Sequence, residues 1–370
     1  MAAIAQSNVE ECLEGSWYDL AEEQLHQLAT RFEIDAGWPQ MQRAYEIICK
    51  ESLGSCPAGS SCRRSSLNGD GVPIQFALRA GEQAPPLQFL SEIGDSSLEP
   101  RDAVDFTARK LRSLSALLQV KGNIDSLIRL LERTCAANIY SLAPGTGGEC
   151  WLGASLTREG HCGLKLYCNG KKGTETERWG RVGKFAAYFG VASLQDELWK
   201  TLGRSMLPLG MGVTLSQTKG PAGRLYFHGY GNRLDYYEGL LRHFGSAQHL
   251  KAFRQYTEIM LGDDRAYPTQ SVVFSAGLDG DRNAAPDIKV EFCGHCLFQS
   301  DWQARERCLR WLALRQIECK TYGDMLTVLA GQMSVAKVNA HVYVGLGWKA
   351  QREYTTIYLK PSWHWPRRER

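Results

Sequence analysis

The sequence contains no apolar run of about eighteen residues, so it offers no conventional membrane-spanning helix. Its first residues, MAAIAQSNVEECLEG, lack the basic stretch and apolar core that mark a secretory signal peptide. Charge of one sign is not in excess either, because 43 Lys and Arg residues oppose 40 Asp and Glu residues. These absences give no support to membrane or nucleic-acid binding, and we expect a cytoplasmic protein with neither partner.

Several short catalytic motifs are also missing. The sequence has no GxxxxGK[ST] phosphate loop, no GxGxxG turn after a strand and no GxSxG nucleophile elbow. The segment LGDDRAYP contains Asp263 and Asp264 without a repeated DDxxD motif, and we interpret it as a solvated turn. The basic run PRRER at residues 366–370 is interpreted as a solvated tail.

The 12 cysteines are scattered along the chain, which is typical of reduced thiols in a cytoplasmic protein. The segment CGHC, from Cys293 to Cys296, has the spacing of a redox-active dithiol. Such a dithiol requires a helix that begins at its first cysteine, whereas we expect Cys293 to end a strand and the next helix to begin near Ser300. A zinc site would need a second ligand pair, which is not evident, so we predict no metal site.

What the sequence does contain is a repeated strand pattern with one apolar and one polar face. In GRLYFHGYGNRL, strand geometry places Leu225 and Phe227 on one face and Arg224, Tyr226 and His228 on the other. A solvated sheet face explains one such strand, but the recurrence of the pattern favours a shared, enclosed polar face. The same alternation gives the polar residues Gln75, Gln88, Lys165, Tyr167, Lys289, Glu291 and Tyr358 on other segments.

The candidate strands occur in five pairs, each joined by a short linker rich in Gly, Pro, Asp or charge, as in β-hairpins. Helical periodicity occupies 101–120, 234–261 and 302–333, after an N-terminal helical segment at about 9–50. A unit repeated in this way favours one closed architecture. The paired segments are 71–80 with 85–93, 150–156 with 163–169, 210–216 with 223–230, 271–278 with 287–294, and 340–348 with 354–361.

We therefore predict a single domain of the mixed α/β (α+β) class over residues 1–370. A helical lead-in over 1–68 precedes a barrel over 69–361, and a tail occupies 362–370. In the barrel, five αββα repeats arrange ten antiparallel strands around a central lumen ringed by helices. Closure removes the sheet edges and turns the polar faces inward, where ten strands leave room for a ligand.

The lumen residues suit the transfer of a prenyl group. Lys165, Arg224 and Lys289 would bind a diphosphate, because cations stabilise a buried polyanion. Aromatic faces attract a carbocation, and an enclosed barrel excludes the water that would quench it. An electron-rich aromatic ring could then attack. The side chains that we expect to shield the cation are Tyr167, Tyr226 and Tyr358.

The order of these strands resembles that of the soluble aromatic prenyltransferases with the ABBA barrel fold, and most of all the dimethylallyltryptophan synthase type. DGVPIQFAL with PPLQFLSEIG resembles the first hairpin of that family, D-G-x-P-[IV]-E-x-S followed by R-F-x-x-E. KLY at 165–167 resembles its K-x-Y strand, RLYFH at 224–228 its R-x-K-x-Y strand, and YTTIYLKP its final strand. The resemblance covers about Gly69 to Pro361.

This resemblance implies an enzyme that transfers a dimethylallyl or longer prenyl group from its diphosphate to an aromatic acceptor, typically an indole or tryptophan derivative. It implies no required cofactor, and Mg²⁺ would only make up missing charge. Peptide prenyltransferases of the cyanobactin type share the fold and remain an alternative. A non-catalytic barrel that binds a small hydrophobic or phosphorylated ligand is another, and a sheet-based interaction protein without a pocket is a third.

Several positions depart from the family pattern. Gln75 stands where the family has a glutamate base, and an amide cannot accept a proton at neutral pH. Gln88 replaces a diphosphate-contacting arginine, and Tyr226 and His228 replace the lysine and tyrosine of R-x-K-x-Y. We therefore expect fewer cations around the diphosphate than in the family, with Gln88 completing the set formed by the three basic residues. His228 and Glu291 face inward by alternation and are the candidates for the missing base.

Overall fold

The computed structural model describes residues 16–54, 67–68, 71–81, 86–93, 100–135, 150–191, 200–203, 205–229, 233–244, 247–262, 271–278, 287–330, 337–349 and 352–362. The predicted turn at Asp263 and Asp264 and the tail at 366–370 lie outside these residues. None of the helices within the described ranges combines the length and apolar character needed to cross a membrane.

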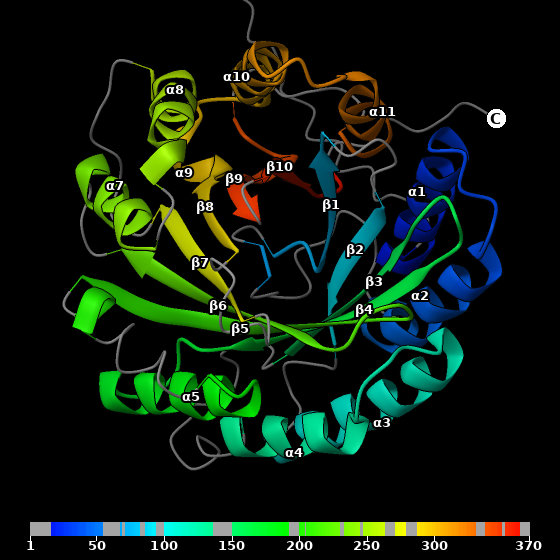
Figure 1. Cartoon of the computed structure of the whole chain (residues 1–370). Helices are drawn as coiled ribbons and strands as arrows, with labels where there is room; N and C mark the ends of the chain where they lie inside the picture. The colour runs from blue at the N-terminus through cyan, green and yellow to red at the C-terminus, as the bar shows by residue number, and fades with distance from the viewer. Residues whose placement is uncertain are drawn as a thin grey trace, which may run out of the picture.

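Ten antiparallel strands form a closed barrel in which each strand pairs with its neighbours in the chain and β1 closes on β10 (Figure 1). All five predicted hairpins are confirmed. One strand is longer than expected, since β5 begins at Met206 rather than Gly210 and is bulged between Pro208 and Gly210. The strands are β1 (Ile74–Ala80), β2 (Leu87–Glu92), β3 (Cys150–Leu156), β4 (Cys162–Asn169), β5 (Met206–Ser216), β6 (Ala222–Gly229), β7 (Val272–Leu278), β8 (Ile288–Cys293), β9 (His341–Lys349) and β10 (Arg352–Leu359).

Helices surround the barrel, as Figure 1 shows. The N-terminal pair closes the ring, because α1 contacts α11 while α2 contacts α3, β2 and β3. This arrangement supports our prediction of a single domain, which otherwise stays a prediction. The helices are α1 (Trp17–Arg31), α2 (Trp38–Leu53), α3 (Pro100–Leu118), α4 (Ile124–Cys135), α5 (Glu175–Tyr188), α7 (Leu234–His243), the 3₁₀ turn η2 (Ala247–His249), α8 (Leu250–Leu261), α9 (Gly294–Leu297), α10 (Asp301–Leu314) and α11 (Lys320–Leu329).

Two segments predicted as continuous helical stretches are each divided, and one helical turn was not predicted. The segment 234–261 is not one helix, because α7 ends at His243 and α8 begins at Leu250. The segment 302–333 is divided in the same way, because α10 ends at Leu314 and α11 begins at Lys320. The helix predicted near Ser300 is confirmed as α10, which begins at Asp301, but the single turn α9 precedes it and begins at Gly294, directly after the strand. A helix of 4 residues is too short to produce a hydrophobic period, which is why the sequence pattern does not indicate it.

The apolar faces of the strands form the core between barrel and helices. Trp179 of α5 stacks on Phe227 of β6 with 5.6 Å between ring centroids. Tyr256 of α8 stacks on Phe292 of β8 at 5.3 Å, nearly parallel. Phe227 and Phe292 are fully buried, and each such side chain contributes about 1.5–3 kcal/mol to folding. Because strand residues alternate, this burial fixes the polar neighbours on the inner face.

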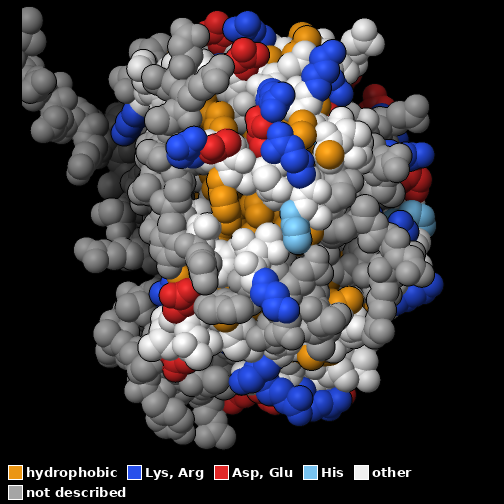
Figure 2. All heavy atoms as spheres, turned by 60° about the vertical axis from the view of Figure 1, so that its left-hand side comes forward, with side chains coloured by type: hydrophobic (Ala, Val, Ile, Leu, Met, Phe, Trp, Pro, Cys, Tyr) orange, Lys and Arg blue, Asp and Glu red, His pale blue; other side chains and the backbone are white. Residues whose placement is uncertain are grey.

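The surface matches the balanced composition. On the face shown in Figure 2, Lys and Arg side chains are interspersed with Asp and Glu, and apolar side chains show between them near the centre of the view. This pattern agrees with the net charge of +3, and the described residues on that face form no extended single-sign surface.

Candidate active site

The inner faces of the strands enclose two adjoining cavities. The first, here called the basic cavity, has a volume of about 260 Å³ and lies among the basic residues of the lumen. The second, the aromatic cavity, has a volume of about 150 Å³ and a mostly apolar lining. The side chains of the basic cavity used below are Arg79, Gln88, Lys165, Lys219, Arg224, Asp287, Lys289, Lys349 and Tyr354. Those of the aromatic cavity are Gln75, Trp151, Lys171, Met211, Glu291 and Tyr343.

Three tyrosines separate the two cavities, because Tyr167, Tyr226 and Tyr358 line both. The rings of Tyr167 and Tyr226 lie 5.8 Å apart at an angle of 47°. Gly212 permits this approach, since a Cβ atom there would lie 3.1 Å from Tyr167 and 3.3 Å from the Tyr226 ring. Burial raises the pKa of all three phenols, so they are neutral hydrogen-bonding groups with exposed ring faces in the lumen.

The basic cavity contains a buried ion pair between Arg224 and Asp287. Arg224 Nη2 lies 2.5 Å from Asp287 Oδ2, and its Nη1 donates to Ser275 Oγ at 3.0 Å. Tyr354 donates its hydroxyl to Asp287 Oδ1 at 2.7 Å. Burial opposes the ionisation of Asp287, but Arg224 outweighs it and holds the pKa of the carboxyl below its ordinary value. Arg224 is therefore held in a fixed orientation, facing the cavity.

Two of the lysines in this cavity are also fixed by partners. Lys165 donates to the side-chain carbonyl of Gln88, so the glutamine that replaces a family arginine orients a neighbouring cation. Lys289 donates to Tyr358 Oη at 2.8 Å and pairs with Glu291 Oε1 at 2.7 Å. Burial lowers the pKa of Lys289, and Glu291 partly restores it. Because Lys289 lines the basic cavity and Glu291 the aromatic one, this ion pair connects the two.

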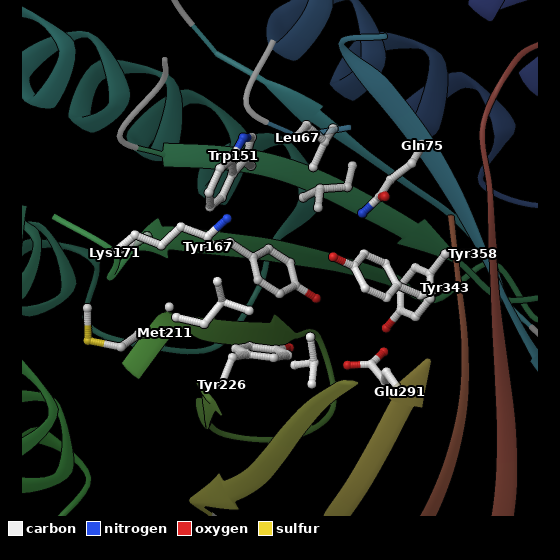
Figure 3. A pocket seen from close by; sticks show the side chains of 15 residues that line it. Leu67, Gln75, Trp151, Tyr167, Lys171, Met211, Tyr226, Glu291, Tyr343 and Tyr358 are labelled. Atoms are coloured by element: carbon white, nitrogen blue, oxygen red, sulfur yellow. The ribbon is translucent and has the colours of Figure 1, made fainter. Parts of the chain in front are cut away.

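Figure 3 shows the aromatic cavity, with Gln75, Tyr343 and Glu291 gathered at one end and Trp151 with Lys171 at the other. Gln75 Oε1 and Trp151 Nε1 are buried, and neither atom has a hydrogen-bond partner among the described residues. Buried polar atoms are nearly always satisfied, so the unpaired carbonyl of Gln75, a residue that lines this cavity, is suited to a hydrogen bond from a ligand.

The carboxylate of Glu291 enters the cavity from β8. Its side chain is only 6% exposed, and its charge is balanced by Lys289. Gly345 on the adjacent strand makes room for it, since a Cβ atom at that position would lie 2.7 Å from Glu291 Cγ. The aromatic cavity thus has a buried carboxylate, Glu291, and an amide, Gln75, at the same end. The amide can orient a ligand, and the carboxylate can accept a proton from it.

The structure brings nearly all predicted site residues into one lumen. Gln75, Gln88, Lys165, Tyr167, Arg224, Tyr226, Lys289, Glu291 and Tyr358 all line one or both cavities. His228 is the exception, as it is half-buried at the end of β6 and lines neither cavity. Burial and Lys171 lower the pKa of His228 to about 4, so its ring is neutral near pH 7. The structure does not bring this residue to the ligand space.

Sequence reasoning missed several lining residues. Arg79 follows Gln75 on the same face of β1, and Tyr343 and Lys349 alternate with the apolar residues of β9, so alternation was a sufficient signal for all three. Asp287 begins the predicted strand 287–294 and alternates with Lys289 and Glu291, so it carried the same signal, whereas Lys219, in the β5–β6 turn, carries none. The basic cavity therefore has more cations than the sequence led us to expect, with Arg79, Lys219 and Lys349 added to the predicted set.

Solved structures of prenyltransferases are similar to this chain over nearly its whole length. Prenyltransferase PriB in its apo form is 17% identical, with a TM-score of 0.77 over 96% of this chain and 98% of that one. The 5-dimethylallyltryptophan synthase from Streptomyces coelicolor is 15% identical, with a TM-score of 0.74 over 95% and 99%. The 6-dimethylallyltryptophan synthase from Micromonospora olivasterospora, in complex with DMASPP and Trp, is 15% identical, with a TM-score of 0.74 over 93% and 97%.

No protein-family model matches the chain, and no curated protein sequence matches it significantly. At these identities the likeness concerns the backbone. The closed ring of ten antiparallel strands, the helices outside it and the length of chain matched all agree with the solved structures. The chain therefore has the fold of the ABBA prenyltransferases, as the resemblance of its strands implied.

Proposed function

We propose that this protein is an aromatic prenyltransferase that moves a dimethylallyl or longer prenyl group from its diphosphate to an indole, such as a tryptophan derivative. One observation carries the proposal: the same three tyrosines line a cation-rich cavity and an aromatic cavity. Two substrates bound on either side of these rings would meet between them. The names of the similar structures, which include DMASPP and Trp complexes, support this assignment.

The basic cavity would hold the donor. Six cationic side chains and one carboxylate line it among the described residues, which suits a diphosphate. As the bond between the allylic carbon and oxygen breaks, the diphosphate leaves with the electron pair, and these cations stabilise its growing charge. They supply the charge that Mg²⁺ supplies in metal-dependent enzymes, so we propose that transfer needs no added metal.

The allyl cation would form beside Tyr167, Tyr226 and Tyr358. A ring face attracts a desolvated cation by about 2 kcal/mol or more. Because burial raises their pKa values, these phenols stay protonated, and no phenolate is present to capture the cation. The enclosed lumen also limits access of water, which would otherwise consume the cation as an alcohol.

The aromatic cavity would hold the acceptor. The open carbonyl of Gln75 is suited to accept the indole N–H, which orients the ring toward the tyrosines without removing its proton. After the ring carbon attacks, the ring must lose a proton to recover its aromaticity. We assign this proton to Glu291, whose carboxylate lines the same cavity, in place of the glutamate that Gln75 replaces.

The test is a transfer assay on the full chain. The protein is incubated with dimethylallyl or geranyl diphosphate and with indoles, phenols or Trp- or Tyr-containing peptides, in the presence of Mg²⁺ or of EDTA. Product masses are then measured by mass spectrometry. We expect one added isoprenoid on an indole, with EDTA causing no loss. Modification of peptides alone would favour the cyanobactin-type alternative. Donor binding without any product would favour a non-catalytic barrel.

A further inference from the structure

We propose that Cys293, His295 and Cys296 form a zinc-binding site at the rim of the barrel. This proposal does not rest on the prenyl-transfer function. The sequence pattern argued against a metal here because it offered only one pair of cysteines. The structure supplies the third ligand from the residue between them, which a search for paired cysteines does not count.

The spacing of the three side chains suits zinc. One ligand atom from each residue lies within 4.8 Å of the other two. Cys293 Sγ is 3.5 Å from Nδ1 and 3.4 Å from Nε2 of His295. A tetrahedral ion with Zn–S of about 2.3 Å and Zn–N of about 2.0 Å separates sulfur and nitrogen by about 3.5 Å. The S···N distances match this value, but Cys293 Sγ is almost equally far from both ring nitrogens, so it lies over the imidazole, and the ring must turn to direct one nitrogen at an ion shared with the two thiols.

The backbone explains why these side chains converge. Strand β8 ends at Cys293, and the single turn α9 follows at once, which brings His295 and Cys296 back over the end of the strand. Gly294 makes this turn possible, because a Cβ atom there would lie 2.6 Å from the carbonyl oxygen of His341. The three ligands thus belong to a tight turn that is pressed against β9 rather than to an extended loop.

The donor set points to zinc rather than to a hard cation. Zinc binds both thiolate and imidazole, whereas Mg²⁺ and Ca²⁺ require oxygen ligands. Both cysteines would bind as thiolates, and two thiolates neutralise the charge of the ion. Because His295 and Cys296 are exposed, an ion can reach the site from solvent. Three protein ligands leave the fourth position to water or to another small donor.

The site adjoins the aromatic cavity. Cys293 stands opposite Tyr343 in the β8–β9 ladder, and Tyr343 lines that cavity. Along β8, Lys289, Glu291 and Cys293 follow one another on the same face. A zinc ion would therefore link the end of β8 to the turn α9 at the rim of the barrel. This position is next to the end of the aromatic cavity where Glu291 lies.

The experiment measures metal binding by the reduced, full-length protein after removal of metal. Co²⁺ serves as the spectroscopic probe and Zn²⁺ as the competitor that displaces it. We expect one equivalent of Co²⁺ with a thiolate charge-transfer band and tetrahedral d–d bands. His295→Ala should weaken Zn²⁺ binding at least tenfold, and Cys296→Ser should remove the charge-transfer band of this site. Cys319→Ser, at a half-buried thiol outside the cluster, is the matched control and should behave as wild type.

Thermal unfolding provides the second measurement. One equivalent of Zn²⁺ should raise the midpoint for the wild type and for Cys319→Ser, but not for Cys296→Ser. A wild-type protein that takes up no Co²⁺ would overturn the proposal, as would a Cys296→Ser variant that binds with unchanged spectrum and affinity. A Cys293–Cys296 disulfide that forms in air, with no metal uptake after reduction, would identify a dithiol instead and also overturn it.

Discussion

Replacement of Glu291 by glutamine separates the two tasks that the structure gives this carboxylate. The side chains of Glu291 and Lys289 are 6% and 5% exposed, and their charged atoms lie 2.7 Å apart. Loss of one member of a buried pair costs about 3–5 kcal/mol when the other charge is left without a partner. Here the glutamine carbonyl can still accept from Lys289, and Tyr358 remains its second partner, so we expect a smaller loss of about 1–3 kcal/mol.

The same substitution removes the proposed proton acceptor. A positioned general base contributes about 10²–10⁴-fold, so kcat for an indole should fall by that factor while the affinity for the prenyl diphosphate changes little. The assay is steady-state turnover of Glu291→Gln, with denaturant unfolding measured on the same preparation. Working at a temperature at which the variant is fully folded keeps the two effects apart.

Glu238→Gln is the matched control. Glu238 is likewise paired with cations, since it accepts two hydrogen bonds from Arg254 and one from Arg242, but it lies on α7 outside the barrel. A surface pair of this kind contributes about 0–1 kcal/mol, so the control should lose little stability and no activity. If Glu291→Gln turns over indole within about threefold of the wild type, the carboxylate is not the base and our assignment of the aromatic cavity is wrong.

Three further predictions address other parts of the lumen. Lys165→Ala should weaken binding of the prenyl diphosphate by about 1.5–3 kcal/mol, measured by titration calorimetry. Arg224→Ala should cause the same loss, and it also leaves the Asp287 carboxylate buried without its cationic partner. Unchanged affinity in both variants would mean that the diphosphate binds elsewhere. Gln75→Glu should keep the fold and leave turnover of an indole unchanged or higher. Gln75→Ala should raise the Michaelis constant for the acceptor more than that for the donor. A larger rise for the donor would mean that the donor, and not the acceptor, binds in the aromatic cavity. Because folding lowers the pKa of Asp287, its ionised carboxylate stabilises the fold above the ordinary carboxyl pKa, and this stabilisation is lost as the pH falls through the folded-state pKa. Asp287→Asn should therefore lose less thermal stability than the wild type between neutral and acidic pH. An equal loss in the variant and the wild type would contradict the role of the ion pair.

Alternation along single strands was enough to predict the barrel and most of its lining. A residue such as Tyr226 can face only one side of its strand, and Leu225 and Phe227 fix that side by packing against helices. The division of the lumen into two cavities could not be predicted. It depends on the register between hairpins, which brings Lys289 beside Tyr358 although 69 positions separate them in the chain.

The features that the sequence did not indicate have equally local causes. His228 has the correct face of β6 but stands at the end of the strand, and alternation carries no information on depth within the barrel. Arg224 and Asp287 form an ion pair although they are distant in sequence, so no sequence motif predicts this pair. The turn at α9 is too short to give a helical period, so the sequence does not show that His295 lies beside the two cysteines.

The order of strands has a consequence for folding. Every strand of the barrel pairs with its neighbours in the chain except at one seam, where Phe76 of β1 meets Leu359 of β10. Hairpins can therefore join the growing sheet one after another, each across a connection that contains at least one helix. Until β9 and β10 arrive, however, the outer edge of β1 has no partner and can pair with another chain. During synthesis, the vulnerability of this protein to misassembly thus ends only when its last hairpin is made.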